Sequence, residues 1–184
     1  PYEDMGLLFL DIDNDGDLDL YAVSGSNEFK AGSPEYRDRV YINDGKGNFS
    51  IAPNALPEIV SSGTTVRAAD VDGDGLLDLF VGGRTPIAQY PYPDKSYLLK
   101  NEGGVFRDVT DEWAPGLKNI GMVTDAIWTD YDGDGWVDLL VVGDYMAITP
   151  FKNSGGRLEK STGTGLENHT GWWNSIVAGD FDGD

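Results

Sequence analysis

Asp11-Ile-Asp-Asn-Asp-Gly-Asp-Leu-Asp19 is the first of three nearly identical nine-residue segments in this chain. The others are Asp70-Val-Asp-Gly-Asp-Gly-Leu-Leu-Asp78 and Asp130-Tyr-Asp-Gly-Asp-Gly-Trp-Val-Asp138, and a fourth begins as Asp180-Phe-Asp-Gly-Asp184. We name the complete segments loop 1, loop 2 and loop 3. Carboxylates at positions 1, 3, 5 and 9 repel one another unless a cation lies among them, and the glycine at position 6 lets the backbone fold around one centre.

These segments predict calcium sites. Ca²⁺ takes about six to eight oxygen ligands in flexible geometry, whereas Mg²⁺ requires a strict octahedron and soft metals prefer thiolate or imidazole. We expect about one Ca²⁺ per complete loop, with position 7 offering its backbone carbonyl. The predicted ligands are Asp11, Asp13, Asp15, Asp17 and Asp19; Asp70, Asp72, Asp74, Leu76 and Asp78; Asp130, Asp132, Asp134, Trp136 and Asp138; and Asp180, Asp182 and Asp184 in the fourth copy.

An EF-hand is the obvious alternative, because its loop begins in the same way. That loop needs a bidentate Glu at position 12 and a helix on each side. Position 12 is Ala22, Val81 and Val141 here, and the flanking segments are strand-like. The sequence therefore excludes an EF-hand and assigns the closing carboxylate to position 9.

Composition limits the partners of the chain. Its 184 residues carry 13 Lys and Arg against 32 Asp and Glu, for a net charge of −19, and sixteen of the acids lie in the four loops. Such acidity argues against nucleic acid and anionic membrane surfaces as partners. There is no cysteine, no signal peptide and no apolar stretch long enough to cross a membrane. Calcium loops of this kind fill where Ca²⁺ is near millimolar, so we expect a secreted or cell-surface location.

The loops belong to a longer repeat, because they begin at residues 11, 70, 130 and 180. In each unit an apolar strand precedes the loop, a second follows it, a third ends at an Asn-x-Gly turn, and a fourth begins after that turn. The expected first strands are 6–10, 65–69, 125–129 and 174–179; the second 18–23, 77–81 and 137–142; the third 40–43, 97–101 and 149–153; the fourth begin at Phe49, Phe106 and Leu158. Four short antiparallel strands per unit predict an all-β propeller.

This pattern resembles the FG-GAP or VCBS repeat, which builds the propeller of integrin α chains and of many bacterial surface proteins. Segments 38–49, 116–125 and 170–176 are similar to the propellers of bacterial cartilage-acidic-protein-like, ASPIC/UnbV-associated proteins. The resemblance covers residues 1–184 as one partial propeller domain. It implies about three blades and the start of another, from a longer propeller of seven or eight blades, with a bacterial, outer-membrane-associated or secreted location.

Ligands are expected on the face opposite the calcium loops. Loops 1–3 are constant, whereas 24–38, 84–95, 108–124 and 159–174 vary in length and chemistry, and variable loops on a rigid scaffold carry binding. Aromatic rings beside Arg and Asn suit protein or glycan recognition. The candidate ligand-binding residues are Arg84, Tyr90, Tyr92, Trp113, Trp172 and Trp173.

The sequence predicts no catalytic residue. It has no Gly-x-Ser-x-Gly elbow, no cysteine and no phosphate-binding loop, and its single histidine is His169. We therefore expect a calcium-binding propeller that serves as a binding or adhesion module, with further blades or partner subunits alongside. Two alternatives stay open: a calcium-dependent polysaccharide lyase-like propeller that cuts acidic glycans, and a structural scaffold subunit of a surface or secretion assembly.

Overall fold

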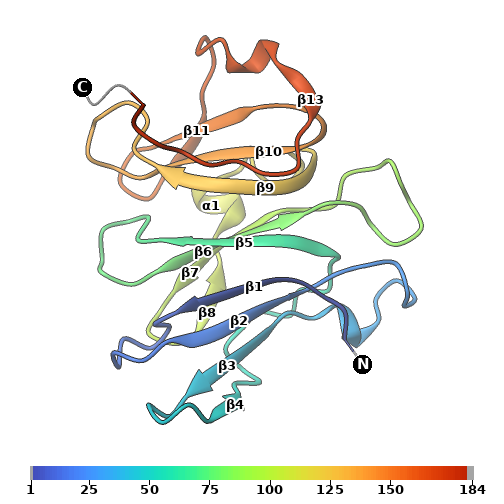
Figure 1. The fold of residues 1–184 in the computed structure, drawn as a ribbon, viewed down its shortest axis with the longest axis vertical. Helices are drawn as coiled ribbons and strands as arrows, with labels where there is room; N and C mark the ends of the chain where they lie inside the picture. The colour runs from blue at the N-terminus through green and yellow to red at the C-terminus, as the bar shows by residue number, and fades with distance from the viewer. Residues whose placement is uncertain (1, 182–184) are drawn as a thin grey trace.

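The structure of this protein is a computed structural model that describes residues 2–181. Three antiparallel sheets follow one another along the chain and are stacked in space, as Figure 1 shows. The first contains β1 (Asp4–Leu10), β2 (Asp19–Ser24), β3 (Arg39–Asn43) and β4 (Phe49–Ile51). The second contains β5 (Gly63–Ala69), β6 (Asp78–Gly83), β7 (Tyr97–Asn101) and β8 (Phe106–Asp108).

The third sheet is formed by β9 (Met122–Thr129), β10 (Asp138–Ala147), β11 (Thr149–Asn153), β12 (Leu158–Lys160) and β13 (Thr170–Trp172). Strands β9 to β12 repeat the meander of the first two sheets, and β13 pairs with the far end of β10. The helical segments are short: η1 (Pro34–Tyr36), α1 (Thr110–Trp113) and η2 (Leu166–Asn168). The predicted all-β fold of four-stranded blades is confirmed. Within the described residues, no helix has the length and apolar character that a membrane span requires.

One predicted strand is wrong. Residues 174–179 were expected to open a fourth blade, yet they form no strand. In the three complete blades the first strand pairs with the second strand across the acidic loop, and within the described part of the chain residues 174–179 pair with no such strand. Ile176 instead lies against β9, where its backbone N–H donates to Asp125 (3.1 Å).

The second sheet is buried on both faces because its strands alternate side chains between two cores. In β6, Leu79 and Val81 join the core shared with the first sheet, and Phe80 joins the core shared with the third. Leu99 and Leu98 of β7 divide in the same way. Side chains of successive strand residues point to opposite faces, so an apolar run of this kind suits a central sheet.

The inner strands β1, β5 and β9 lie side by side. Side chains join their backbones: the Thr64 hydroxyl donates to the carbonyl of Val123 (2.8 Å), and Arg67 Nε donates to that of Ala126 (2.9 Å). These hydrogen bonds join the second blade to the third. The outer face of the first sheet is exposed and apolar, with Leu7, Phe9, Phe49 and Ile51 on its surface.

The strands set two opposite faces. Each acidic loop joins the first and second strands of its blade, and Figure 1 shows all three loops along its left edge. The longer connections 24–38 and 84–96 leave the other ends of β2 and β6, along the right edge of Figure 1. We call these the acidic-loop face and the variable face.

Candidate metal centres

The three acidic loops share one backbone conformation, which their own carboxylates hold. The position 1 carboxylates of Asp11, Asp70 and Asp130 accept hydrogen bonds from the position 6 glycine N–H at 3.0, 3.0 and 2.9 Å. Each position 5 carboxylate accepts one from the position 7 N–H at 2.9 Å. The position 6 glycines have φ of +93°, +87° and +91°, a region that side chains with a Cβ rarely adopt. Glycine at position 6 therefore suits the backbone conformation that the three loops share.

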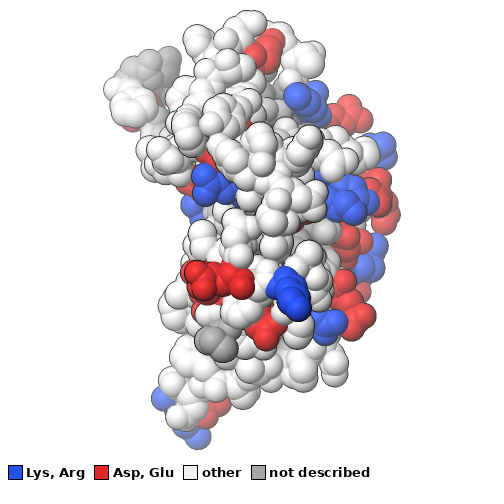
Figure 2. All heavy atoms as spheres, turned by 90° about the vertical axis from the view of Figure 1, so that its right-hand side faces the viewer, with Lys and Arg blue, Asp and Glu red and all other residues white. Residues whose placement is uncertain are grey.

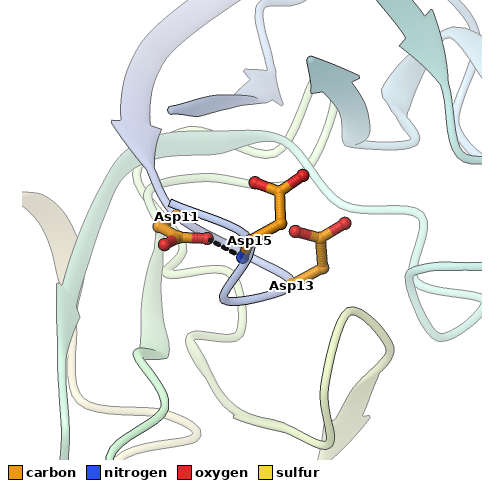
Figure 3. A group of neighbouring side chains, drawn as sticks. All are labelled: Asp11, Asp13 and Asp15. Atoms are coloured by element: carbon orange, nitrogen blue, oxygen red, sulfur yellow. Dashed lines mark hydrogen bonds between the residues drawn. The ribbon is translucent and has the colours of Figure 1, made fainter. Parts of the chain in front are cut away.

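In loop 1 the side chains of Asp11, Asp13 and Asp15 each offer an oxygen, and these oxygens lie within 4.8 Å of one another. Figure 3 shows Asp13 and Asp15 projecting to the same side of the loop, while Asp11 turns to accept the N–H of Asp15 (3.1 Å). Burial and the charges of neighbouring carboxylates, chiefly Asp15, raise the pKa of Asp13. A cation among these oxygens would relieve that repulsion.

Loops 2 and 3 gather a slightly different set. Their clusters are Asp70, Asp72 and Asp78, and Asp130, Asp132 and Asp138, again within 4.8 Å. In both, the position 9 carboxylate joins positions 1 and 3.

The position 9 carboxylates are fully buried and tie each loop to the third strand of its blade. Asp78 accepts the N–H of Val71 in the loop (3.2 Å) and that of Asn101 at the end of β7 (2.9 Å). Asp19 and Asp138 make the same pair of contacts in their own blades. Burial raises the pKa of Asp78 to about 6, against the opposing effect of those hydrogen bonds, and burial likewise raises the pKa of Asp138.

Two lysines lie against the loops and were not predicted. Lys100 in β7 contacts the carboxylates of Asp72 and Asp74, and Lys152 in β11 contacts those of Asp132 and Asp134. Burial lowers the pKa of Lys100, but its hydrogen bonds to the two carboxylates outweigh this and raise the pKa well above its ordinary value. Hydrogen bonds to Asp132 and Asp134 likewise raise the pKa of Lys152. Both side chains are therefore held as ammonium ions.

The second and third blades also contact the acidic loop of the blade before them. The side-chain amide of Asn101 donates to the carbonyl of Ile12 in loop 1 (2.8 Å), and that of Asn153 donates to Val71 in loop 2 (2.8 Å). A Cβ on Gly156 would lie 2.9 Å from the Cβ of Asp72, so the turn approaches the loop closely. The Asn-x-Gly turns thus support the neighbouring blade's loop as well as their own hairpin.

The donors in these loops are carboxylates and backbone carbonyls, without histidine or cysteine. Clusters of this chemistry fit a hard cation such as Ca²⁺ and do not fit zinc or copper. Strands flank each loop, and the position 12 residues Ala22, Val81 and Val141 are buried in β2, β6 and β10. The structure therefore agrees with the exclusion of an EF-hand.

Comparison with known families identifies the repeat. Residues 11–81 and 130–184 match the FG-GAP-like repeat. The chain belongs to the FG-GAP-like repeat family. The matched residues include all three complete loops of this FG-GAP-like chain and the start of the fourth. No curated protein matches the chain.

Position 7 of the repeat differs among the loops. Asp17 and Leu76 occupy it in loops 1 and 2, and Trp136 occupies it in loop 3. The Trp136 ring extends to loop 2, where a Cβ on Gly73 would lie 3.4 Å from it. Carbonyl ligation at position 7 stays a prediction. Asp180 is the one predicted ligand of the fourth copy within the described residues, since Asp182 and Asp184 lie outside them.

Three of the candidate ligand-binding residues come together on the variable face. Arg84 Nε donates to Asp144 Oδ2 (2.7 Å), Tyr90 shares a hydrogen bond with the Tyr145 hydroxyl (2.9 Å), and Trp172 packs against the Tyr145 ring. Asp144 and Tyr145 were not predicted.

The other three candidates lie elsewhere. Trp173 is half-buried and its indole N–H donates to the carbonyl of Met146 (3.2 Å), while Tyr92 is exposed outside this group. Trp113 packs on the core, with the Lys100 ammonium 5.0 Å from its ring centroid. Trp113 therefore stands beside loop 2 and away from the variable-face group.

Proposed function

We propose that this chain is part of a calcium-binding β-propeller that serves as a secreted or cell-surface binding and adhesion module for protein or glycan ligands. The observation that carries the proposal is that a carboxylate cluster containing positions 1 and 3 of the acidic loop recurs in three successive blades. Each blade's first and second strands meet at its loop, so each Ca²⁺ would fix that hairpin.

The role proposed for calcium is structural. Each cluster gathers carboxylates whose charges oppose folding when they are not balanced. An ion that binds the folded loop and not the unfolded chain stabilises the fold by mass action. Because the next blade's turn contacts each of the first two loops, an ordered loop also supports the contact between blades.

The proposed location follows from the type of site. Calcium modules with oxygen ligands on exposed loops commonly function outside the cell, where Ca²⁺ is near millimolar. The net charge of −19 remains strongly negative after three ions bind, which disfavours nucleic acid as a partner. The variable face, where the aromatic candidates gather, is proposed as the ligand surface. Further blades or a partner subunit are proposed against the exposed apolar face of the first sheet.

Thermal unfolding in millimolar Ca²⁺, in Mg²⁺ and in excess EGTA tests this function. We expect the melting temperature to rise with Ca²⁺, to respond less to Mg²⁺ and to fall in EGTA. Asp74→Ala should remove one bound ion, whereas Asp111→Ala, at an exposed site on α1, should remove none. Unchanged melting in EGTA would count against the proposal.

One observation favours the lyase alternative. A lyase needs a basic residue beside a metal, and Lys100 and Lys152 lie beside the loop 2 and loop 3 carboxylates. While these lysines pair with carboxylates their raised pKa keeps them protonated, which makes them poor general bases. Release of unsaturated uronates from acidic polysaccharides, measured by ultraviolet absorbance, would establish the lyase activity.

A further inference from the structure

A cavity of about 510 Å³ opens on the variable face between the second and third blades. Its lining includes Tyr90, Ile120, Met122, Asp144, Tyr145 and Met146. Asp144 lies six residues along β10 from Asp138, a strand length of about 20 Å. The cavity is therefore remote from the acidic loops, on the surface that Figure 2 views directly. The upper half of that surface is mostly uncharged, whereas charged side chains gather along its right-hand edge and across its lower middle.

Aromatic rings form the outer part of this site. The exposed fractions of Tyr90, Tyr145 and Trp172 are 55%, 59% and 60%. The rings of Tyr145 and Trp172 have centroids 5.0 Å apart and planes inclined by 36°. Exposed aromatic rings in mutual contact give a broad apolar platform edged by phenolic hydroxyl groups, which is the surface that the C–H face of a sugar ring prefers.

Tyr145 is held in an unusual backbone conformation. Its φ is +56°, in the left-handed region that a bulky residue rarely adopts. The neighbouring β10–β13 pairing contains an irregular step between Asp144 and Met146, which is where this conformation occurs. Backbone strain of this kind gathers at ligand sites, where the surrounding structure fixes it.

A polar pair from two blades lies at this cavity, because Asp144 is among the residues that line it. Arg84 follows β6 in the second blade and donates to Asp144 Oδ2 in the third. The Asp144 side chain is fully buried, and its Oδ1 has no hydrogen-bond partner among the described residues. A buried acceptor without a donor is unfavourable, so the site offers one acceptor to a ligand hydroxyl that enters it.

We propose that this cavity binds an uncharged sugar unit of a glycan, which stacks on Tyr145 and Trp172 and donates a hydroxyl hydrogen bond to Asp144. The inference rests on the proposed function of the variable face as a ligand surface. Arg84 already balances the Asp144 charge, so the site has no unpaired cation to attract a uronate. The net charge of −19 adds a general repulsion toward acidic glycans.

Calorimetric titration of the full chain in millimolar Ca²⁺ tests this site. The probes are neutral hexasaccharides of glucose, mannose and galactose, with oligogalacturonate as the acidic comparison. We expect at least one neutral probe to bind, and Tyr145→Ala and Trp172→Ala to weaken it by about tenfold or more. Asp144→Asn should weaken it as well. Tyr92→Ala, which alters an exposed ring of the same connection outside the cavity, should leave the affinity unchanged.

Several results of this titration would overturn the proposal. The proposal fails if no neutral hexasaccharide shows a heat of binding, or if oligogalacturonate binds more tightly than every neutral probe. It also fails if Tyr145→Ala and Trp172→Ala both leave the affinity unchanged. Thermal melting of each variant with and without Ca²⁺ shows whether it folds. If Asp144→Asn does not fold, Trp172→Ala still tests the site, because Trp172 lies at the exposed end of a short strand. A chain that Ca²⁺ stabilises but that binds no neutral sugar overturns this proposal alone. Sugar binding without any calcium response would overturn the proposed calcium role instead.

Discussion

Loop 1 and the two loops that follow it reach the same backbone shape in different electrostatic surroundings. Loop 1 holds five carboxylates, and the third strand of its blade places Ile42 before the turn asparagine. Loops 2 and 3 hold four carboxylates each, and Lys100 and Lys152 occupy the position of Ile42. Two repeats thus balance their acidic loops partly with a lysine of their own third strand, whereas the third strand of the first repeat offers loop 1 no such lysine.

This difference predicts an order among the sites. A lysine ammonium on the position 3 and position 5 carboxylates competes with Ca²⁺ and also supports the loop when Ca²⁺ is removed. We therefore expect loop 1 to bind Ca²⁺ most tightly and to lose most order in a chelator. Loops 2 and 3 should bind more weakly and keep more of their shape.

The largest effect is expected at position 9, which all three loops share. Both oxygens of Asp78 accept backbone N–H groups. Asp78→Asn replaces one of these oxygens with an NH₂ donor, so one backbone N–H loses its acceptor. An unsatisfied buried group costs about 1–3 kcal/mol, so urea unfolding should show a loss of that size even in EGTA, together with the loss of one ion in Ca²⁺. Asp19→Asn and Asp138→Asn should behave alike.

Asp111→Asn is the matched control, because Asp111 is exposed on α1 and pairs with Lys118 outside the loops. A loss as large in this variant as in Asp78→Asn would contradict the role assigned to position 9. An Asp19→Asn chain that binds as many calcium ions as the unsubstituted chain would show that loop 1 does not need its position 9 carboxylate to bind Ca²⁺.

Acid should weaken the loop 2 site next most strongly. Burial raises the pKa of Asp78 to about 6, and Ca²⁺ binds the ionised carboxylate, so affinity should fall about tenfold between pH 7 and pH 5. Without metal, the folding stability of the chain should change with pH in the opposite direction. The folded chain holds this proton more tightly than the unfolded chain, whose pKa is near 3.8, so stability should fall as pH rises from about 4 to 6.

Calcium titration calorimetry at both pH values checks this prediction in a chain whose other two loops carry Asp13→Asn and Asp132→Asn. Equal affinity at pH 5 and pH 7 would show that the pKa of Asp78 is not raised. Urea unfolding of the same chain in EGTA across that range measures the reversed slope.

The smallest effect is expected from the lysines that distinguish the loops. Lys100→Met and Lys152→Met should each raise the calcium affinity of their loop by about two- to fivefold, because each removes an ammonium that competes with Ca²⁺ through a partly exposed ion pair. Ile42→Lys should do the reverse in loop 1. Lys118→Met, which removes a lysine paired with Asp111 on α1, should change no calcium site. Unchanged calcium affinities in Lys100→Met, Lys152→Met and Ile42→Lys would show that these lysines do not influence calcium binding.

The repeat made most of the fold predictable. The places of the twelve strands β1 to β12 followed from the apolar segments on each side of a loop of constant length. Strands β1, β5 and β9 begin two or three residues before their predicted starts, and β10 ends at Ala147 where the prediction ended at residue 142. The strand expected at 174–179 was wrong because apolar residues form a strand only when a partner is present. The partner in every other blade comes from the segment after the acidic loop.

Contacts between blades were harder to predict from the sequence. Asn101 and Ile12 are 89 residues apart, and no local pattern shows that the turn of one blade meets the loop of another. A signal for the lysines did exist, since Lys precedes the turn asparagine in the second and third repeats and Ile precedes it in the first. The conformation of Tyr145 and the pairing of Arg84 with Asp144 depend on how the blades pack, so the sequence alone did not indicate them.

The most direct test of the central claim is the number of calcium ions bound by residues 1–184, counted by native mass spectrometry in millimolar Ca²⁺. We expect one ion for each complete loop, and one fewer for each position 9 variant. A chain that binds no calcium, or that keeps the same number of ions after Asp19→Asn, Asp78→Asn and Asp138→Asn, would contradict the central claim.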